Sequence, residues 1–120
     1  MIEVMAESSG NILAVKASAK LTDADYKDTF IPKLEEVIVE HGKARLLFAF
    51  DESFEGWEPK AMWDDASWGI RHLNDFEKIA MVGAKKWVEW GAKLDAHFMK
   101  GTLKTFDRDQ LDSAREWIKE

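Results

Sequence analysis

The chain has 120 residues, of which 46% are hydrophobic and 33% are charged, and its formal net charge is −6 at pH 7. This length suits one domain with its own core, and the composition excludes a disordered chain. The sequence has no cysteine, which excludes disulfides, thiolate catalysis and cysteine-bound zinc. The negative charge argues against nonspecific nucleic-acid binding, which depends on Lys and Arg at the phosphates. Six tryptophans are the one unusual feature of the composition.

The first eighteen residues predict two short strands joined by a turn. Residues 2–6 place apolar side chains at every second position, which is the period of a half-buried strand. Residues 8–11 (Ser-Ser-Gly-Asn) are typical of a tight turn, and residues 12–15 resume an apolar run. The sequence therefore predicts an N-terminal β-hairpin.

A helix is predicted next, from about residue 22 to residue 41. Thr22 is suited to cap its first amides, and apolar residues follow at helical spacing to give one core-facing stripe. Pro32 lies inside this pattern and lacks a backbone donor, so we expect a kink or a restarted helix there. Gly42 suits the left-handed conformation that ends many helices.

The remaining elements alternate between strand and helix. Residues 45–50 form an almost continuous apolar run, which is typical of a central parallel strand buried on both faces. Pro59 then opens a helix of residues 59–73, and residues 79–83 predict a second buried strand. Three further elements complete the chain: a helix over residues 84–99, a strand over 103–106 and a terminal helix capped by Asp107.

This order predicts a single α/β domain that spans residues 1–120. We expect a mainly parallel sheet of about five strands, with an N-terminal hairpin and four flanking helices.

Four segments resemble the SpoIIAA-like family of small bacterial proteins. They are residues 51–57 with their Phe-Glu-Gly-Trp stretch, residues 61–65 with Trp-Asp-Asp, residues 79–87, and residues 106–117. The resemblance implies the fold shared by STAS domains, which include anti-sigma-factor antagonists, and by CRAL-TRIO lipid carriers. It indicates a fold and leaves the biochemical role open.

One functional feature of the STAS relatives does not carry over to this chain. Anti-sigma-factor antagonists are phosphorylated on a serine in a turn after the central strand, whereas the comparable residues 55–58 here are Glu-Gly-Trp-Glu. Ser53 lies nearby, but three carboxylates surround it in the sequence and would repel a phosphate. The resemblance therefore does not predict a phosphorylation switch.

Acidic residues and histidines are the candidates for metal binding or catalysis. The acidic residues crowd one segment: Asp51, Glu52, Glu55, Glu58, Asp64 and Asp65. Their spacing is not that of a calcium loop, and solvation of the loop and of the next helix N-terminus explains them more simply. His41, His72 and His97 are too far apart to share a helix face, and none pairs with a nucleophile. We therefore predict no metal site, no catalytic residue and no cofactor.

The two middle helices carry the strongest functional signal. Their apolar faces look wider than packing on a sheet requires, which indicates an apolar cavity between them. The residues predicted to line it are Trp57, Met62, Trp63, Ile70, Trp87, Trp90, Leu94 and Phe98. A second set, on or beside the polar faces, is predicted to contact a membrane surface: Trp68, Trp90, Lys85, Lys86 and Lys93.

Other interpretations of these tryptophans remain open. They can fill an ordinary core, or they can form the apolar interface of a homodimer.

Three functions follow from these observations. The first is a non-catalytic binding module for a nonpolar small molecule or lipid, whose Trp-rich helices open or contact a membrane. The alternative is a protein-interaction module that resembles the anti-sigma-factor antagonists without their phosphorylated serine. The second alternative is an enzyme that acts at an interface, with Asp51, Asp64, Asp65 or His72 as acid or base. Without a signal peptide or an apolar run of roughly 20 residues, we expect a cytoplasmic protein, or one peripheral to the inner membrane surface.

Overall fold

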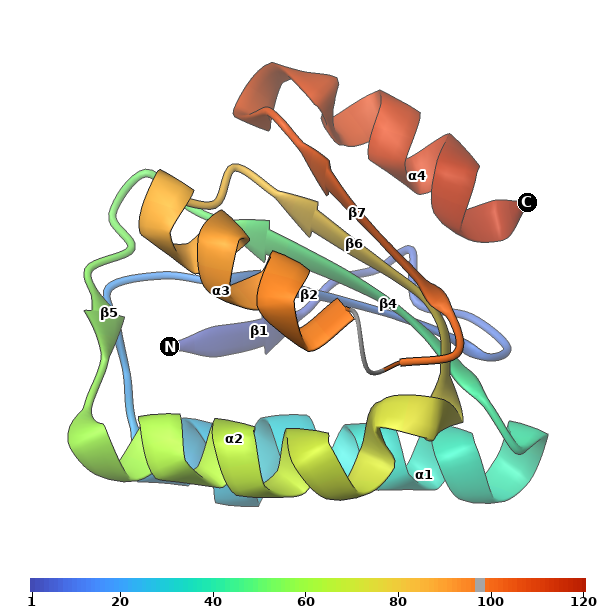
Figure 1. Cartoon of the computed structure of the whole chain (residues 1–120), viewed down its shortest axis with the longest axis horizontal. Coiled ribbons are helices and arrows are strands. Elements are labelled where there is room, and N and C mark those ends of the chain that lie inside the picture. Colours follow the sequence, from blue (N-terminus) through green and yellow to red (C-terminus); the bar gives the residue numbers. More distant parts are fainter. Residues whose placement is uncertain (97–98) are drawn as a thin grey trace.

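The structure is a computed structural model that describes residues 1–96 and 99–120, with all their side chains except those of residues 70, 87 and 94–96. A five-stranded sheet forms its centre (Figure 1). In spatial order its strands are β1 (Ile2–Val4), β2 (Ile12–Ala17), β4 (Ala44–Phe50), β6 (Phe76–Val82) and β7 (Thr102–Phe106). Only β1 runs antiparallel to its neighbour in this sheet, so the predicted hairpin and mainly parallel sheet are both confirmed.

The helices cover the two faces of the sheet unequally. Successive parallel strands advance in one direction across the sheet, so right-handed crossovers place the three connecting helices on the same face. These helices are α1 (Ile31–His41), α2 (Pro59–His72) and α3 (Lys86–Ala96). The terminal helix α4 (Leu111–Lys119) lies on the opposite side of the sheet from α1 and α2 (Figure 1).

The central strand β4 divides the core into two clusters. Leu46, Phe48 and Phe50 point toward α1, α2 and α3, whereas Leu47 and Ala49 point toward α4. All five side chains are buried, which confirms that this apolar run is a strand buried on both faces.

The first helical segment restarts at the predicted proline. Thr22 and Asp25 exchange hydrogen bonds between side chain and backbone, so Thr22 caps the segment as predicted. A π-helix, η1 (Asp25–Phe30), comes first, and the α-helix α1 begins at Ile31 with Pro32 in its first turn. The missing N–H of proline is tolerated there because the first amides of a helix have no partner within it.

Other boundaries differ from the prediction by a few residues. β6 begins at Phe76, three residues early, after a 3-10 turn, η2 (Leu73–Asp75). Asp107 and Gln110 form the predicted cap before α4, as a reciprocal capping box in a 3-10 turn, η3 (Arg108–Gln110). The end predicted for the helix of residues 84–99 falls partly on residues 97–98, outside the described residues.

The sequence analysis did not predict a second pair of short strands. β3 (Lys20–Leu21) pairs in parallel with β5 (Gly56–Trp57), and two residues are too few to show a period. This pair holds the loop after β4 against the start of η1, so it brings Trp57 next to Tyr26.

Candidate functional site

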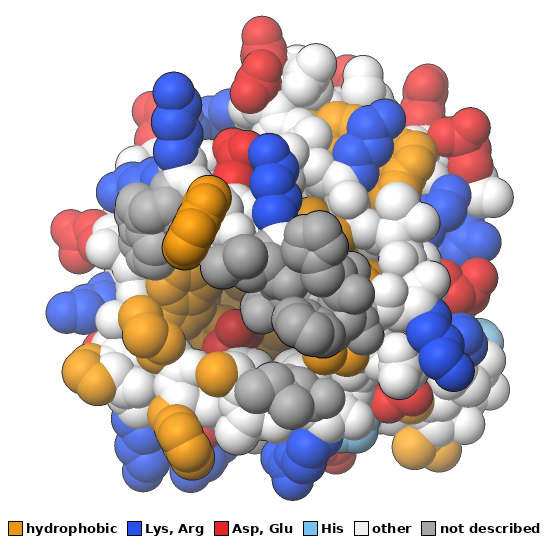
Figure 2. Space-filling view, in the orientation of Figure 1, with side chains coloured by type: hydrophobic (Ala, Val, Ile, Leu, Met, Phe, Trp, Pro, Cys, Tyr) orange, Lys and Arg blue, Asp and Glu red, His pale blue; other side chains and the backbone are white. Residues whose placement is uncertain are grey.

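A cavity of about 410 Å³ lies between the sheet and the helices on its larger face. Its floor is made by side chains of β4 and β6, and its sides by η1, α1, α2 and α3. Figure 2 shows this face hollowed among hydrophobic side chains, with an acidic side chain inside the hollow. The hollow lies between the sheet and the helices of this face, α2 and α3 among them.

The cavity exists because α2 packs mainly against η1 and β5 rather than directly on the five-stranded sheet. Small residues face the space: Ala66 and Gly69 on α2, and Gly91 and Ala92 on α3. A Cβ atom added to Gly69 or Gly91 would meet no other atom within 4 Å. The helices thus leave a space that larger side chains at these positions would occupy.

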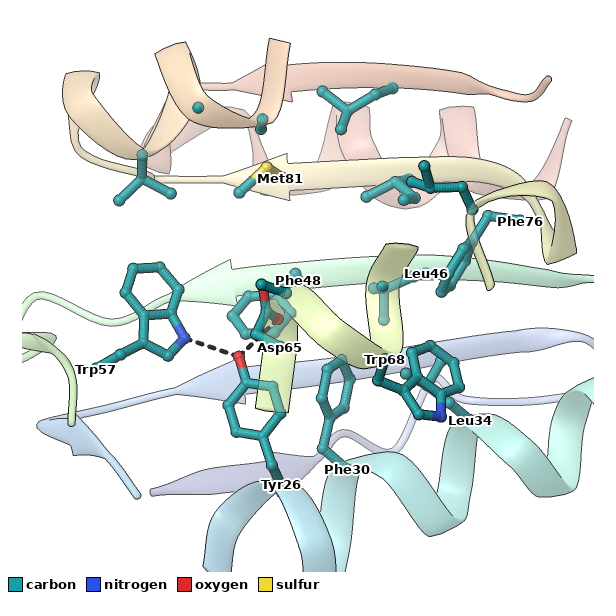
Figure 3. Close-up of a pocket in the computed structure, with 18 of the residues that line it drawn as sticks. Tyr26, Phe30, Leu34, Leu46, Phe48, Trp57, Asp65, Trp68, Phe76 and Met81 are labelled. Carbon is teal, nitrogen blue, oxygen red and sulfur yellow. Dashed lines mark hydrogen bonds between the residues drawn. The ribbon is translucent and has the colours of Figure 1, made fainter. Parts of the chain in front are cut away.

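One chain of hydrogen bonds runs along the wall of this apolar space. The indole N–H of Trp57 donates to the hydroxyl oxygen of Tyr26 at 2.7 Å, and that hydroxyl donates to Oδ1 of Asp65 at 2.9 Å (Figure 3). These residues come from β5, η1 and α2, three segments far apart in the sequence. Asp65 is the one acidic residue among the described residues that line the cavity.

Tyr26 serves in this chain as a hydrogen-bond donor to Asp65. Burial, and then the nearby charge of Asp65, raise the pKa of Tyr26 well above its ordinary value, because both disfavour a phenolate. The phenol therefore keeps its proton at neutral pH and is unsuited to act as a general base there.

The residues predicted to line the cavity are found in different places. Trp57 and Met62 line it, but Trp63 is 71% exposed and lies outside it. Trp90 is 69% exposed and is not among the described lining residues; those on α3 are Val88, Gly91 and Ala92. The predictions for Ile70, Trp87, Leu94 and Phe98 concern side chains outside the described part of the structure.

The structure corrects the predicted surface position of Trp68. This side chain is 6% exposed and lines the cavity, and its indole N–H donates to Oε1 of Glu35 at 3.1 Å. Its ring stacks on that of His72, with 4.1 Å between the ring centroids. The sequence analysis interpreted the acidic residues of this segment as solvated, whereas Asp65 points inward and accepts a hydrogen bond from Tyr26. The other residues predicted to lie at the surface are exposed: Trp90, Lys85, Lys86 and Lys93.

Two other residues of the acidic segment, Asp64 and Asp51, interact with nearby side chains. Close interaction between the carboxyl groups of Asp23 and Asp64 lowers the pKa of Asp23 and raises the pKa of Asp64, because the two groups disfavour each other's negative charge. Within the described residues, no group of three or more His, Asp or Glu side chains could hold a metal ion. The Ser53 hydroxyl donates to Oδ2 of Asp51 at 2.7 Å, inside the acidic loop.

Sequence reasoning missed the hydrogen-bonded centre of the site. Tyr26 lies within the predicted helix of residues 22–41, whose apolar residues were expected to face the core. Asp65 lies in the acidic segment that was interpreted as solvated. The residues around each of them do not indicate that the two side chains contact each other. Met81 on β6 and Met99 before β7 also line the cavity, although the sequence analysis named neither. Among the described residues, none of the helices is long and apolar enough to cross a membrane.

Comparisons with known proteins agree with this architecture. Residues 12–119 match the SpoIIAA-like family. A crystal structure of an uncharacterized protein of the DUF3478 family from Shewanella loihica PV-4, described as having a SpoIIAA-like fold, superposes with a TM-score of 0.76. The two chains are 28% identical, over 98% of this chain and 93% of that one. The search among curated proteins returns no match. With the family match covering nearly the whole chain and the fold agreeing, the chain belongs to the SpoIIAA-like family.

Proposed function

We propose that this protein is a non-catalytic binding module for a nonpolar small molecule, which occupies the cavity between the sheet, α2 and α3. The observation that carries the proposal is the cavity itself, since its volume of about 410 Å³ is unusual for a core of this size. Small-molecule sites typically enclose about 300–1,000 Å³, with mostly apolar walls and a few polar groups that fix orientation. The Trp57–Tyr26–Asp65 chain supplies such groups.

The chemistry of the walls supports a ligand with a large apolar part. Aromatic and aliphatic side chains of β4 and β6 form the floor, including Phe48 and Met81. Each Å² of apolar surface that a ligand removes from water contributes about 25 cal/mol to binding. Water inside the cavity would find few hydrogen-bond partners away from Tyr26 and Asp65, so a nonpolar ligand would displace it readily.

Filling the cavity from Gly69 tests this proposal. We expect wild-type protein to bind decanol in isothermal titration calorimetry, and Gly69→Leu to lose binding by roughly tenfold or more, since the added side chain occupies the ligand's space. Leucine is also a better helix former than glycine, so the variant should remain folded.

A matched control adds the same side chain elsewhere. Ser113 is exposed on α4, on the other side of the sheet, and Ser113→Leu should bind decanol as the wild type does. Wild-type protein that does not bind decanol would contradict the proposal and favour the protein-interaction module. Equal affinities in the wild type and Gly69→Leu would place the bound decanol outside the cavity.

Exposed aromatic residues support a second proposal, that α2 and α3 contact a membrane surface where the ligand enters. Trp63 on α2 and Trp90 on α3 are both mostly exposed, and Met62 is 49% exposed. Hydrophobic side chains protrude beside the hollow in Figure 2, and Lys and Arg side chains lie around the same face. This combination is typical of a helix that lies on an anionic membrane surface.

Sedimentation with anionic liposomes tests the membrane proposal. The wild type should co-sediment, and the double variant Trp63→Ser, Trp90→Ser should largely stay in solution, because these indoles are the largest exposed hydrophobic side chains among the described residues. Val39, which is 85% exposed on α1, gives the matched control Val39→Ser, which should co-sediment like the wild type. Loss of dimerisation in the double variant, without liposome binding by the wild type, would indicate a homodimer interface instead.

A further inference from the structure

Five aromatic residues of the cavity wall contact one another in a closed circuit. In order of contact they are Tyr26, Phe30, Phe48, Phe50 and Trp57, and all of them line the cavity. The centroids of successive rings are 4.8–6.2 Å apart. The hydrogen bond from the Trp57 indole to the Tyr26 hydroxyl closes the circuit (Figure 3). We call these five residues the aromatic circuit.

The aromatic circuit has a fixed geometry. Its tyrosine and its phenylalanines are all buried, so their rings are held by neighbours on several sides. Three of its contacts are edge to face, with interplanar angles of 74° to 88°. In such contacts the positive edge of one ring meets the negative face of another. Because the rings are already ordered, they lose little conformational freedom when a ligand packs against them.

Methionines adjoin the aromatic circuit. Met81 on β6 pairs in register with Phe48 on β4, and both side chains line the cavity. Met99, just before β7, lines it as well. A thioether sulfur makes favourable contacts with the edge of an aromatic ring. An aromatic ligand would therefore gain from both kinds of wall, whereas an alkyl chain gains only from the burial of its surface.

We infer that the natural ligand carries an aromatic ring, which packs against the aromatic circuit. The inference rests on the proposed function, since it concerns the ligand of the same cavity. Contacts between aromatic rings stabilise a complex beyond the effect of the area that they bury. Of two ligands with equal hydrophobicity, the one with an aromatic ring should therefore bind more tightly. Decanol binds through the burial of apolar surface alone.

Two alcohols of the same carbon number isolate the effect of aromaticity. 4-Phenyl-1-butanol and 4-cyclohexyl-1-butanol differ only in whether the six-membered ring is aromatic or saturated. Their affinities for the wild type are measured by isothermal titration calorimetry, and each is divided by the octanol–water partition coefficient of the alcohol. This correction removes the difference in hydrophobicity. The corrected affinity should be higher for the phenyl compound by roughly three- to tenfold.

Two variants of β4 locate the source of this preference. Phe48→Leu removes one ring of the aromatic circuit and should bring the corrected affinities of the two alcohols close together. Leu46→Val is the control, because Leu46 lines the cavity from the same strand and belongs to the same core cluster. It also enlarges the cavity but removes no ring, so it should keep the wild-type preference. Circular dichroism checks that both variants are folded, and the comparison of the alcohols in the wild type needs no variant.

The outcomes separate this inference from the proposal beneath it. Wild-type protein whose corrected affinity for the cyclohexyl compound equals or exceeds that for the phenyl compound overturns the inference. The binding function still stands in that case if Gly69→Leu loses decanol binding. An undiminished phenyl preference in folded Phe48→Leu also overturns the inference, because the aromatic circuit would not be its source. Wild-type protein that binds neither alcohol nor decanol overturns both.

Discussion

Replacing Leu47 by alanine should lower the free energy of unfolding by about 4 kcal/mol, near the upper end for a leucine removed from a core. Leu47 is fully buried in the central strand β4, where it packs toward α4. Its cluster includes Ala14, Ala80 and Ala114, small side chains that cannot move in to fill the space left behind. A cavity would therefore remain, and its cost adds to the lost burial.

Urea denaturation of the wild type and Leu47→Ala measures this difference. Val39→Ala is the control, because Val39 is exposed on α1 and its truncation should change stability by less than about 0.5 kcal/mol. A loss of less than about 1 kcal/mol for Leu47→Ala would mean that the α4 side of the sheet is not tightly packed.

The second large effect is expected at Gly101, just before β7. A Cβ atom at this position would overlap the carbonyl oxygens of Phe76 and Glu77, which belong to the neighbouring strand β6. Backbone atoms in a sheet cannot move aside as a flexible side chain can, so β6 and β7 would have to separate. We expect Gly101→Ala to destabilise the protein by about 3 kcal/mol.

Gly69 supplies the comparison for Gly101, since the same substitution meets no atom there. In the interior of α2, alanine should stabilise the protein by about 0.5–1 kcal/mol relative to glycine. Thermal denaturation followed by circular dichroism should thus move the two variants in opposite directions. Equal stability of Gly101→Ala and the wild type would show that β7 does not approach β6 this closely.

These substitutions probe a difference between the two sides of the sheet. On the side of α4, Leu47 and its neighbours form a closely packed layer between one helix and the strands. On the other side, a space of about 410 Å³ is lined by residues of the sheet and of the three helices that cover it. The cavity and the closely packed layer beneath α4 therefore lie on opposite faces of the sheet, and β4 contributes side chains to both.

The fold could be predicted from the sequence because its signals are local. The apolar run of β4 and the caps at Thr22 and Asp107 each follow from a few neighbouring residues. Alternation of strands and helices then restricts the topology, since parallel strands need right-handed crossovers. The restarted helix at Pro32 was also predictable, because proline removes a backbone donor wherever it stands.

The centre of the site could not be predicted, because it depends on contacts between distant segments. Asp65 lies on the inward face of α2 and accepts a hydrogen bond from Tyr26, 39 residues earlier in the sequence. From the sequence alone, an aspartate on a helix is expected to face solvent. The sequence analysis likewise placed Trp68 at the surface and Trp63 in the cavity, whereas Trp68 is buried and Trp63 is exposed. The short β3–β5 pair that positions Trp57 gives no periodic signal either.

Methionine methyl groups offer the most direct test of the central claim, that the cavity takes up a nonpolar ligand. The chain has five methionines. Met62, Met81 and Met99 line the cavity from three different elements or loops, whereas Met1 is exposed and Met5 packs on the α4 side. Their methyl resonances, labelled isotopically and assigned by substitution, can be followed by NMR while decanol is added.

The account predicts that the resonances of Met62, Met81 and Met99 shift together along one saturation curve, while those of Met1 and Met5 stay in place. Movement of the half-exposed Met62 alone, or of no methionine at saturating ligand, would contradict it, because a ligand that never reaches Met81 on the sheet is not inside the cavity.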